Sequence, residues 1–120
     1  MYKFQDRVNA WMLHTLPASI MDVNERGKRF CEEALELVQS IGLTRAEVLE
    51  LVDYVYGRPV GRIEEEVGGV GVTLSSLCNI HNIDFELCFD HELDYKCWPN
   101  SDAIRLKYKN GGDSSGDLPE

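Results

Sequence analysis

The sequence predicts an all-α fold, and three observations support this prediction. Segments with the alternating apolar pattern of a strand are nearly absent. Residues that start and stop helices recur along the chain at intervals of one helix length. The chain has 120 residues, of which 43 % are hydrophobic, so it can bury a core without disulfides. We therefore expect about five helices followed by a short C-terminal helix.

The first two helices are defined by a proline and a glycine. The first is expected over residues 2–14, because the residue before Pro17 avoids helical dihedral angles. The second is expected over residues 24–41, with Asn24 as its N-cap. Gly42 can then adopt the left-handed conformation that ends a helix.

The third helix carries the clearest start signal in the chain. Thr44 and Glu47 have the spacing of a capping box, in which each side chain bonds the backbone N–H of the other residue. The helix is expected to end at Tyr56, just before Gly57. The remaining helices are expected at residues 61–80, 84–98 and 101–107. Residues 1–110 are thus predicted to be one helical domain, and residues 111–120, which have little to bury, a disordered tail.

Acidic side chains gather at two places in this helical pattern. Glu33 and Glu36 are i and i+3 neighbours on the second helix, where like charges cost about 0.2–0.5 kcal/mol. A hard divalent cation reverses that cost, because Mg²⁺ and Mn²⁺ prefer oxygen ligands. Glu66 lies at the same edge of the fourth helix's apolar stripe that Glu33 occupies on the second. The sequence therefore predicts that Glu33, Glu36 and Glu66 meet at one margin of a helical core, where bundles build metal sites.

The apolar stripes that define this margin follow helical spacing. Side chains four, three and four residues apart make the stripe of the second helix, and similar spacing makes that of the fourth. Glu64 and Glu65 are interpreted as a solvated helix start, where negative charge suits the helix dipole. Arg29 lies four residues before Glu33 and is expected to pair with it. The stripe residues are Phe30, Ala34, Leu37 and Ile41 in the second helix, and Ile63, Val67, Val70, Leu74 and Leu77 in the fourth.

Net charge and cysteine spacing narrow the class of protein. A net charge of −9 argues against a nucleic-acid duplex as the main partner. No apolar run approaches the roughly 20 residues of a membrane span, and no signal peptide is visible, so no membrane partner is expected. The four cysteines lie 47, 10 and 9 residues apart with no CxxC pair, a spacing that fits buried free thiols in a reducing cytosol better than a zinc site or a disulfide framework. We therefore expect a cytoplasmic protein.

Several motifs in order then resemble one family. The segment Glu32-Glu33-Ala34-Leu35-Glu36 is similar to the EExxE motif of the MazG-like, all-α nucleoside triphosphate pyrophosphohydrolases. The segment Glu66-Val67-Gly68-Gly69 falls where that family has a second motif, ExxD. Residues 77–84 are similar to the family's asparagine-containing turn. The resemblance covers residues 4–108 and is strongest to a phage-associated branch of the family.

The resemblance implies a fold, an activity and an assembly. The fold is four-helix-bundle-like and belongs to an obligate oligomer, a homodimer or a dimer of dimers, with active sites near the subunit interface. The activity is hydrolysis of a nucleoside triphosphate to the monophosphate and pyrophosphate with Mg²⁺ or Mn²⁺. The branch favours dGTP, with dATP and GTP as alternatives, in phage nucleotide metabolism and hence in the host cytoplasm.

The resemblance also assigns metal ligands. Glu33, Glu36 and Glu66 match ligand positions, but Gly69 stands where the family has an aspartate. Asp53, at the stripe edge of the third helix, is the preferred replacement, and Glu32 is the other candidate.

Further roles follow from the same resemblance. Glu32 or Glu36 would orient or deprotonate the attacking water. Trp11 is a candidate wall of the base pocket, and Asn79 a candidate contact to sugar or base. Arg105 and Lys107 resemble the family's C-terminal basic residues, which would stabilise the leaving pyrophosphate.

Less specific interpretations stay open for these residues. Trp11 can be a core or dimer contact, Asn79 a helix C-terminal residue, and the two cations plain surface charges. Gly69 can provide close approach of another helix or room for substrate. Because Gly69 replaces a ligand, the main alternative function is a helical protein that binds nucleotide and metal without turnover. A structural helical dimer without metal is the third possibility.

Overall fold

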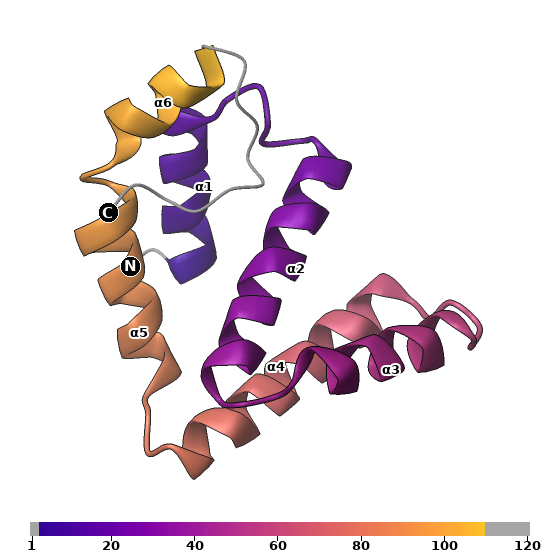
Figure 1. The fold of residues 1–120 in the computed structure, drawn as a ribbon. Helices are drawn as coiled ribbons and strands as arrows, with labels where there is room; N and C mark the ends of the chain where they lie inside the picture. The colour runs from indigo at the N-terminus through magenta and orange to yellow at the C-terminus, as the bar shows by residue number, and fades with distance from the viewer. Residues whose placement is uncertain (1–2, 110–120) are drawn as a thin grey trace. The chain divides into compact units, whose positions relative to one another are not determined.

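The structure, a computed structural model, describes residues 3–109, and every regular element within them is helical (Figure 1). The all-α prediction is therefore confirmed for these residues, whereas the predicted tail at residues 111–120 lies outside them. None of the described helices has the length and apolar content needed to cross a membrane. The elements are α1 (Phe4–Thr15), α2 (Val23–Ser40), α3 (Arg45–Tyr56), α4 (Ile63–Ile80), α5 (Phe85–Glu92), the π-helix η1 (Leu93–Cys97) and α6 (Ser101–Lys109).

The predicted helix starts and stops were mostly correct. At α3, Glu47 donates its backbone N–H to Thr44 Oγ1 (3.2 Å), and Thr44 donates its own to Glu47 Oε1 (3.0 Å). The capping box is therefore confirmed. Gly42 takes the predicted left-handed conformation, with φ of 95°. Asn24, however, was the wrong N-cap for α2: the Glu25 N–H bonds the carboxylate of Asp22 (3.1 Å). The carboxylate of Asp22 also suits the positive end of the helix dipole.

The fifth predicted helix is interrupted near its end. Instead of one α-helix to Trp98, α5 gives way to the wider turn of η1, closed by a bond from the Trp98 N–H to the Leu93 carbonyl (3.1 Å). Such π-turns have no simple sequence signature and are often found at functional sites. Leu93 and Cys97, the first and last residues of η1, both line the same pocket.

The chain divides into two compact units, and unit 1 comprises residues 3–34 and 86–109 of the described chain. It contains α1, the first part of α2, α5, η1 and α6. Trp11 donates its indole N–H to Ser101 Oγ (3.0 Å), and Thr15 donates its hydroxyl to the same oxygen (3.0 Å). These bonds join α1 to α6 inside an apolar core. The core residues are Trp11, Met12, Leu16, Leu93 and Ile104.

Unit 2 comprises Leu35–Phe85 and contains the rest of α2 with α3 and α4. None of its residues is buried. The segment of α4 is helical, as its apolar spacing predicted. The side chains of its apolar stripe are nevertheless exposed, Ile63 to 81 % and Val67 to 66 %. Periodicity therefore identified the helix correctly, but this stripe does not form a core within the unit.

Candidate functional site

The acidic motif on α2 is organised by one arginine. Arg29 Nη1 bonds Glu32 Oε2 (2.5 Å), and its Nη2 bonds Glu33 Oε1 (2.6 Å). The pairing of Arg29 with Glu33 is confirmed, and it extends to the neighbouring carboxylate. The side chain of Arg29 is only 14 % exposed, against 34 % for Glu32 and 53 % for Glu33. One guanidinium thus partly neutralises two adjacent carboxylates.

The other predicted metal ligands lie in unit 2. Glu36 is exposed one turn further along α2, and Asp53 is exposed on α3. The carboxylate of Glu66 folds back against Gly61, so that a Cβ at position 61 would collide with it. Residues 3–109 contain no group of three His, Cys, Asp or Glu side chains that could hold a metal ion. The predicted convergence of these carboxylates stays a prediction.

Gly69, the position of the missing aspartate, is not required for packing inside the chain. An added Cβ would have no atom within 4 Å. The position therefore has room for a side chain, and the structure gives no reason within the chain for a glycine. In helices, glycine costs about 1 kcal/mol relative to alanine.

The donor atoms present fit a hard divalent cation. Carboxylate oxygens are the ligands that Mg²⁺ and Mn²⁺ prefer, and no soft donor lies among the predicted ligands. These carboxylates thus have the donor chemistry of a hard-cation site, but residues 3–109 do not bring three of them into a group that could hold the ion.

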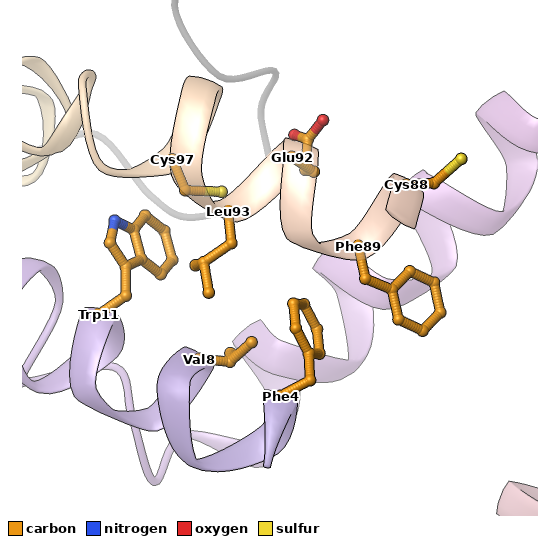
Figure 2. A pocket seen from close by; sticks show the side chains of 8 residues that line it. All are labelled: Phe4, Val8, Trp11, Cys88, Phe89, Glu92, Leu93 and Cys97. Atoms are coloured by element: carbon orange, nitrogen blue, oxygen red, sulfur yellow. The ribbon is translucent and has the colours of Figure 1, made fainter. Parts of the chain in front are cut away.

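Unit 1 also holds an apolar pocket between α1 and the α5–η1 segment (Figure 2). Its volume is about 200 Å³. Figure 2 shows Trp11 and Leu93 facing each other across it, while the Glu92 carboxylate points away from Trp11. Trp11 is 7 % exposed, and its N–H is already bonded to Ser101, so its ring is fixed as a wall. The lining residues are Phe4, Val8, Trp11, Cys88, Phe89, Glu92, Leu93 and Cys97.

The Cys97 thiol links the pocket to the acidic motif. Burial raises the pKa of Cys97 to about 11, and the nearby charge of Glu92 adds to the increase. The charge of Glu33 also raises this pKa, while Lys96 and Arg29 lower it. Since only charges in the neighbourhood have such effects, the pair of Arg29 and Glu33 lies within electrostatic range of the pocket wall.

A second arginine, Arg7, connects the two sides of the pocket through ion pairs. Arg7 on α1 bonds Asp90 Oδ1 (2.5 Å) and Asp94 Oδ1 (2.6 Å) on the α5–η1 segment. The sequence predicted neither these two ion pairs of Arg7 nor most of the residues that line the pocket. The helical spacing of Phe4, Val8 and Trp11 could have revealed the pocket face of α1. Nothing local could have paired Arg7 with carboxylates more than eighty residues away.

The predicted substrate-binding residues have different surroundings. Trp11 lines the pocket, which agrees with either a base wall or a core contact. Arg105 donates to the His14 carbonyl through Nε (3.0 Å) and Nη2 (2.7 Å), and so caps the end of α1. Lys107 is exposed on α6. Asn79 is exposed at the end of α4, where its carbonyl accepts the Asn82 N–H (3.2 Å).

Comparison with known proteins adds no assignment to these observations. No protein family, no curated protein and no solved structure matches this chain. The resemblance to the MazG-like family therefore rests on the motifs of the sequence. The structure contributes the Arg29-bound carboxylates and the Trp11 pocket, both within unit 1.

Proposed function

We propose that the protein is a metal-dependent nucleotide pyrophosphohydrolase. It would convert a purine deoxynucleoside triphosphate, dGTP first and dATP or GTP next, to the monophosphate and pyrophosphate. The observation that most supports this function is that an apolar pocket and a carboxylate of the acidic motif lie near each other in unit 1. An apolar pocket walled by Trp11 lies within electrostatic range of Glu33, a motif carboxylate. A base and a phosphate chain need such a pair of adjoining sites.

The acidic residues would hold Mg²⁺ or Mn²⁺. Glu33, Glu36 and Glu66 are the proposed ligands, with Asp53 in place of the aspartate that Gly69 lacks. When bound, such a cation neutralises phosphate charge and lowers the pKa of a water molecule.

The pocket would bind the base. An apolar cavity of about 150 Å³ is enough for a benzene ring, so about 200 Å³ with an open side can accept part of a purine. The Trp11 ring needs no reorganisation for stacking, because Ser101 already holds its N–H. Apolar walls also exclude water from the base, which strengthens electrostatic interactions at the adjoining carboxylates.

The remaining chain groups would act on the water and the leaving group. Glu32 and Glu36 are the candidates for orienting the attacking water, and Glu32 is already fixed by Arg29. Of the two C-terminal cations, Lys107 is the stronger candidate for the pyrophosphate. Arg105 is occupied by the backbone of α1, and Lys107 is exposed.

We include a homodimer, alone or as a dimer of dimers, in this proposal. The support is unit 2, whose helices expose large apolar side chains and bury none of their residues. Exposed apolar surface of this kind is unusual for a protein that acts as a monomer. A site in the host cytoplasm follows from the substrate, since that is where nucleotides for phage DNA are made.

A panel of the eight common nucleoside triphosphates tests this function. Each is incubated with the full chain and Mg²⁺ or Mn²⁺, and products are separated as monophosphate plus pyrophosphate or diphosphate plus phosphate. We expect the first pair of products and a preference for purine deoxynucleotides. Release of inorganic phosphate, or no metal-dependent product from any substrate, would contradict the proposal.

The second candidate is a protein that binds nucleotide and metal without turnover. Gly69 and the Arg29-bound Glu33 favour it, because both reduce the number of ligands ready for a cation. Calorimetry would then detect metal-dependent binding of dGTP while no pyrophosphate appears. A purely structural helical dimer would show neither.

A further inference from the structure

We propose that the apolar pocket of unit 1 binds a nucleobase through one face of its ring and does not read the polar edges of the base. Ring size then decides which bases bind, so that different purines bind alike and the smaller pyrimidines bind more weakly. This inference rests on the proposed function, because it concerns the base site of the same substrate. Any preference for dGTP over dATP then arises outside this pocket.

The pocket aims no free polar group at a ligand. Trp11 already donates its indole N–H to Ser101 (3.0 Å). Figure 2 shows the Glu92 carboxylate and the Cys88 sulfur pointing away from Trp11. Burial raises the pKa of Cys97 to about 11, so its thiol stays neutral at pH 7 and is only a weak hydrogen-bond donor. None of the lining residues is a cation that could hold a phosphate.

This lack of partners decides which part of a base the pocket can accept. A polar edge placed among these side chains would lose its hydrogen bonds to water and gain none in return, which is unfavourable. A ring face has no hydrogen-bonding group, and its contact with apolar or aromatic side chains is favourable. Every base has such a face, so binding through it tolerates different bases. The face therefore lies against the pocket, and the edges stay in water.

The arrangement of the lining side chains suits a flat ring. Trp11 and Leu93 are 7 % and 2 % exposed and form the floor of the pocket. Phe4, Val8 and Phe89 are half-buried and lie nearer its opening, and the two phenylalanine rings pack together with centroids 5.2 Å apart. A purine has two fused rings and covers more of this opening than the single ring of a pyrimidine. It therefore removes more apolar surface from water.

The experiment follows the indole N–H of Trp11 by nuclear magnetic resonance while nucleosides are added to the full chain. The chain has two tryptophans, so the signal that remains in Trp98→Phe is that of Trp11. Nucleosides carry no phosphate and are added without metal, so the titration reports on the base site alone.

Deoxyguanosine, deoxyadenosine and deoxyinosine differ only in the groups at the base edge. We expect their dissociation constants to lie within about threefold of one another, whereas a site that reads an edge separates such analogues by at least about tenfold. Deoxycytidine should bind about fivefold more weakly than the purine nucleosides, because its single ring has less stacking surface.

Val8→Phe tests where the base binds. The larger side chain extends into the pocket, and purine nucleosides should bind about tenfold more weakly, which corresponds to loss of one stacking contact. Val23→Phe is the matched control. It makes the same change in unit 1 at a residue that is 85 % exposed and does not line the pocket, and binding should change less than about twofold.

Circular dichroism checks that each variant is folded. Should Val8→Phe fail to fold, Cys88→Leu replaces it. Cys88 is exposed and also lines the pocket, so a larger side chain there should weaken purine binding about threefold.

The outcomes separate this inference from the proposed function. If deoxyguanosine binds at least about tenfold more tightly than deoxyadenosine or deoxyinosine, the pocket reads an edge and the inference is wrong. It is also wrong if no nucleoside shifts the Trp11 signal, or if Val8→Phe and Val23→Phe bind equally well. Pyrophosphate release from triphosphates in any of these cases leaves the proposed function standing. Similar binding of the purine nucleosides without pyrophosphate release supports the inference and contradicts the proposed function.

Discussion

The indole N–H of Trp11 on α1 bonds the hydroxyl oxygen of Ser101 on α6 at 3.0 Å, and both residues are buried. This bond fixes the ring that walls the apolar pocket. The Thr15 hydroxyl reaches the same oxygen, so one side chain accepts two buried hydrogen bonds. Ser101 therefore holds both the α1–α6 contact and the Trp11 wall of the pocket.

Replacement of Ser101 by alanine should destabilise the protein. The change leaves the Trp11 N–H and the Thr15 hydroxyl without their acceptor in a buried site, which costs about 1–3 kcal/mol. Urea unfolding, followed by circular dichroism, measures the loss in free energy of unfolding. Ser76→Ala on exposed α4 is the control and should have an effect below about 0.5 kcal/mol. Equal effects of the two variants would refute a role for this acceptor.

Replacement of Gly61 by alanine should move the carboxylate of Glu66. The added Cβ would occupy the place of that carboxylate, which sits at the end of a flexible side chain. Stability should therefore change by less than about 0.5 kcal/mol. Metal-dependent pyrophosphate release should fall on the order of 10–100-fold, because small displacements of catalytic groups are costly.

Gly68→Ala is the control for this change, since an added Cβ there has no atom within 4 Å. It should keep its activity. Equal activity of the two alanine variants would contradict this prediction. It would mean either that the position of the Glu66 carboxylate does not depend on the space at Gly61, or that Glu66 is not a metal ligand.

Stability at alkaline pH should depend on Cys97. The pKa of its thiol is about 11 in the folded protein and 9.0 for an ordinary cysteine. Between these values the unfolded chain loses its proton first, so the free energy of unfolding falls as pH rises. The contribution is complete below pH 9 and is lost by pH 11. Two pKa units correspond to about 2.7 kcal/mol, and solvent around this half-buried thiol reduces the loss to about 1 kcal/mol.

Urea unfolding of the unmodified chain and of Cys97→Ala, at pH values from 9 to 11, measures this contribution. The decline should be shallower in Cys97→Ala, which has no thiol to ionise. Every other ionisable group is common to both chains, so its effect cancels in the comparison. Parallel declines would show that the Cys97 thiol is not shielded in the folded protein.

The parts of the fold that were predictable depend on neighbours in sequence. Thr44 and Glu47 are three residues apart, and their reciprocal bonds followed from that spacing alone. The left-handed conformation of Gly42 was likewise predictable from its place directly after a helix. The error at α2 arose because Asp22 and Asn24 are both good capping residues two positions apart, and spacing does not choose between them.

Features that were missed depend on contacts distant in sequence. Arg7 bonds Asp90 and Asp94 on another helix, and nothing in one sequence pairs these charges. The π-turn at η1 likewise has no local signature. For the candidate site, local spacing predicted that Arg29 binds Glu33, because both lie on one helix. It did not show that Arg29 would also bind Glu32.

The central claim, that Glu33 binds a cation needed for hydrolysis, is tested most directly by metal-dependent pyrophosphate release from dGTP in the unmodified chain and in Glu33→Gln. Glu65→Gln is the matched control, because Glu65 is an exposed helix carboxylate near an arginine. We expect the unmodified chain and Glu65→Gln to release pyrophosphate. Glu33→Gln should lose at least the roughly 10–100-fold that follows loss of a residue supporting a metal ligand. Unchanged release by Glu33→Gln would contradict the claim.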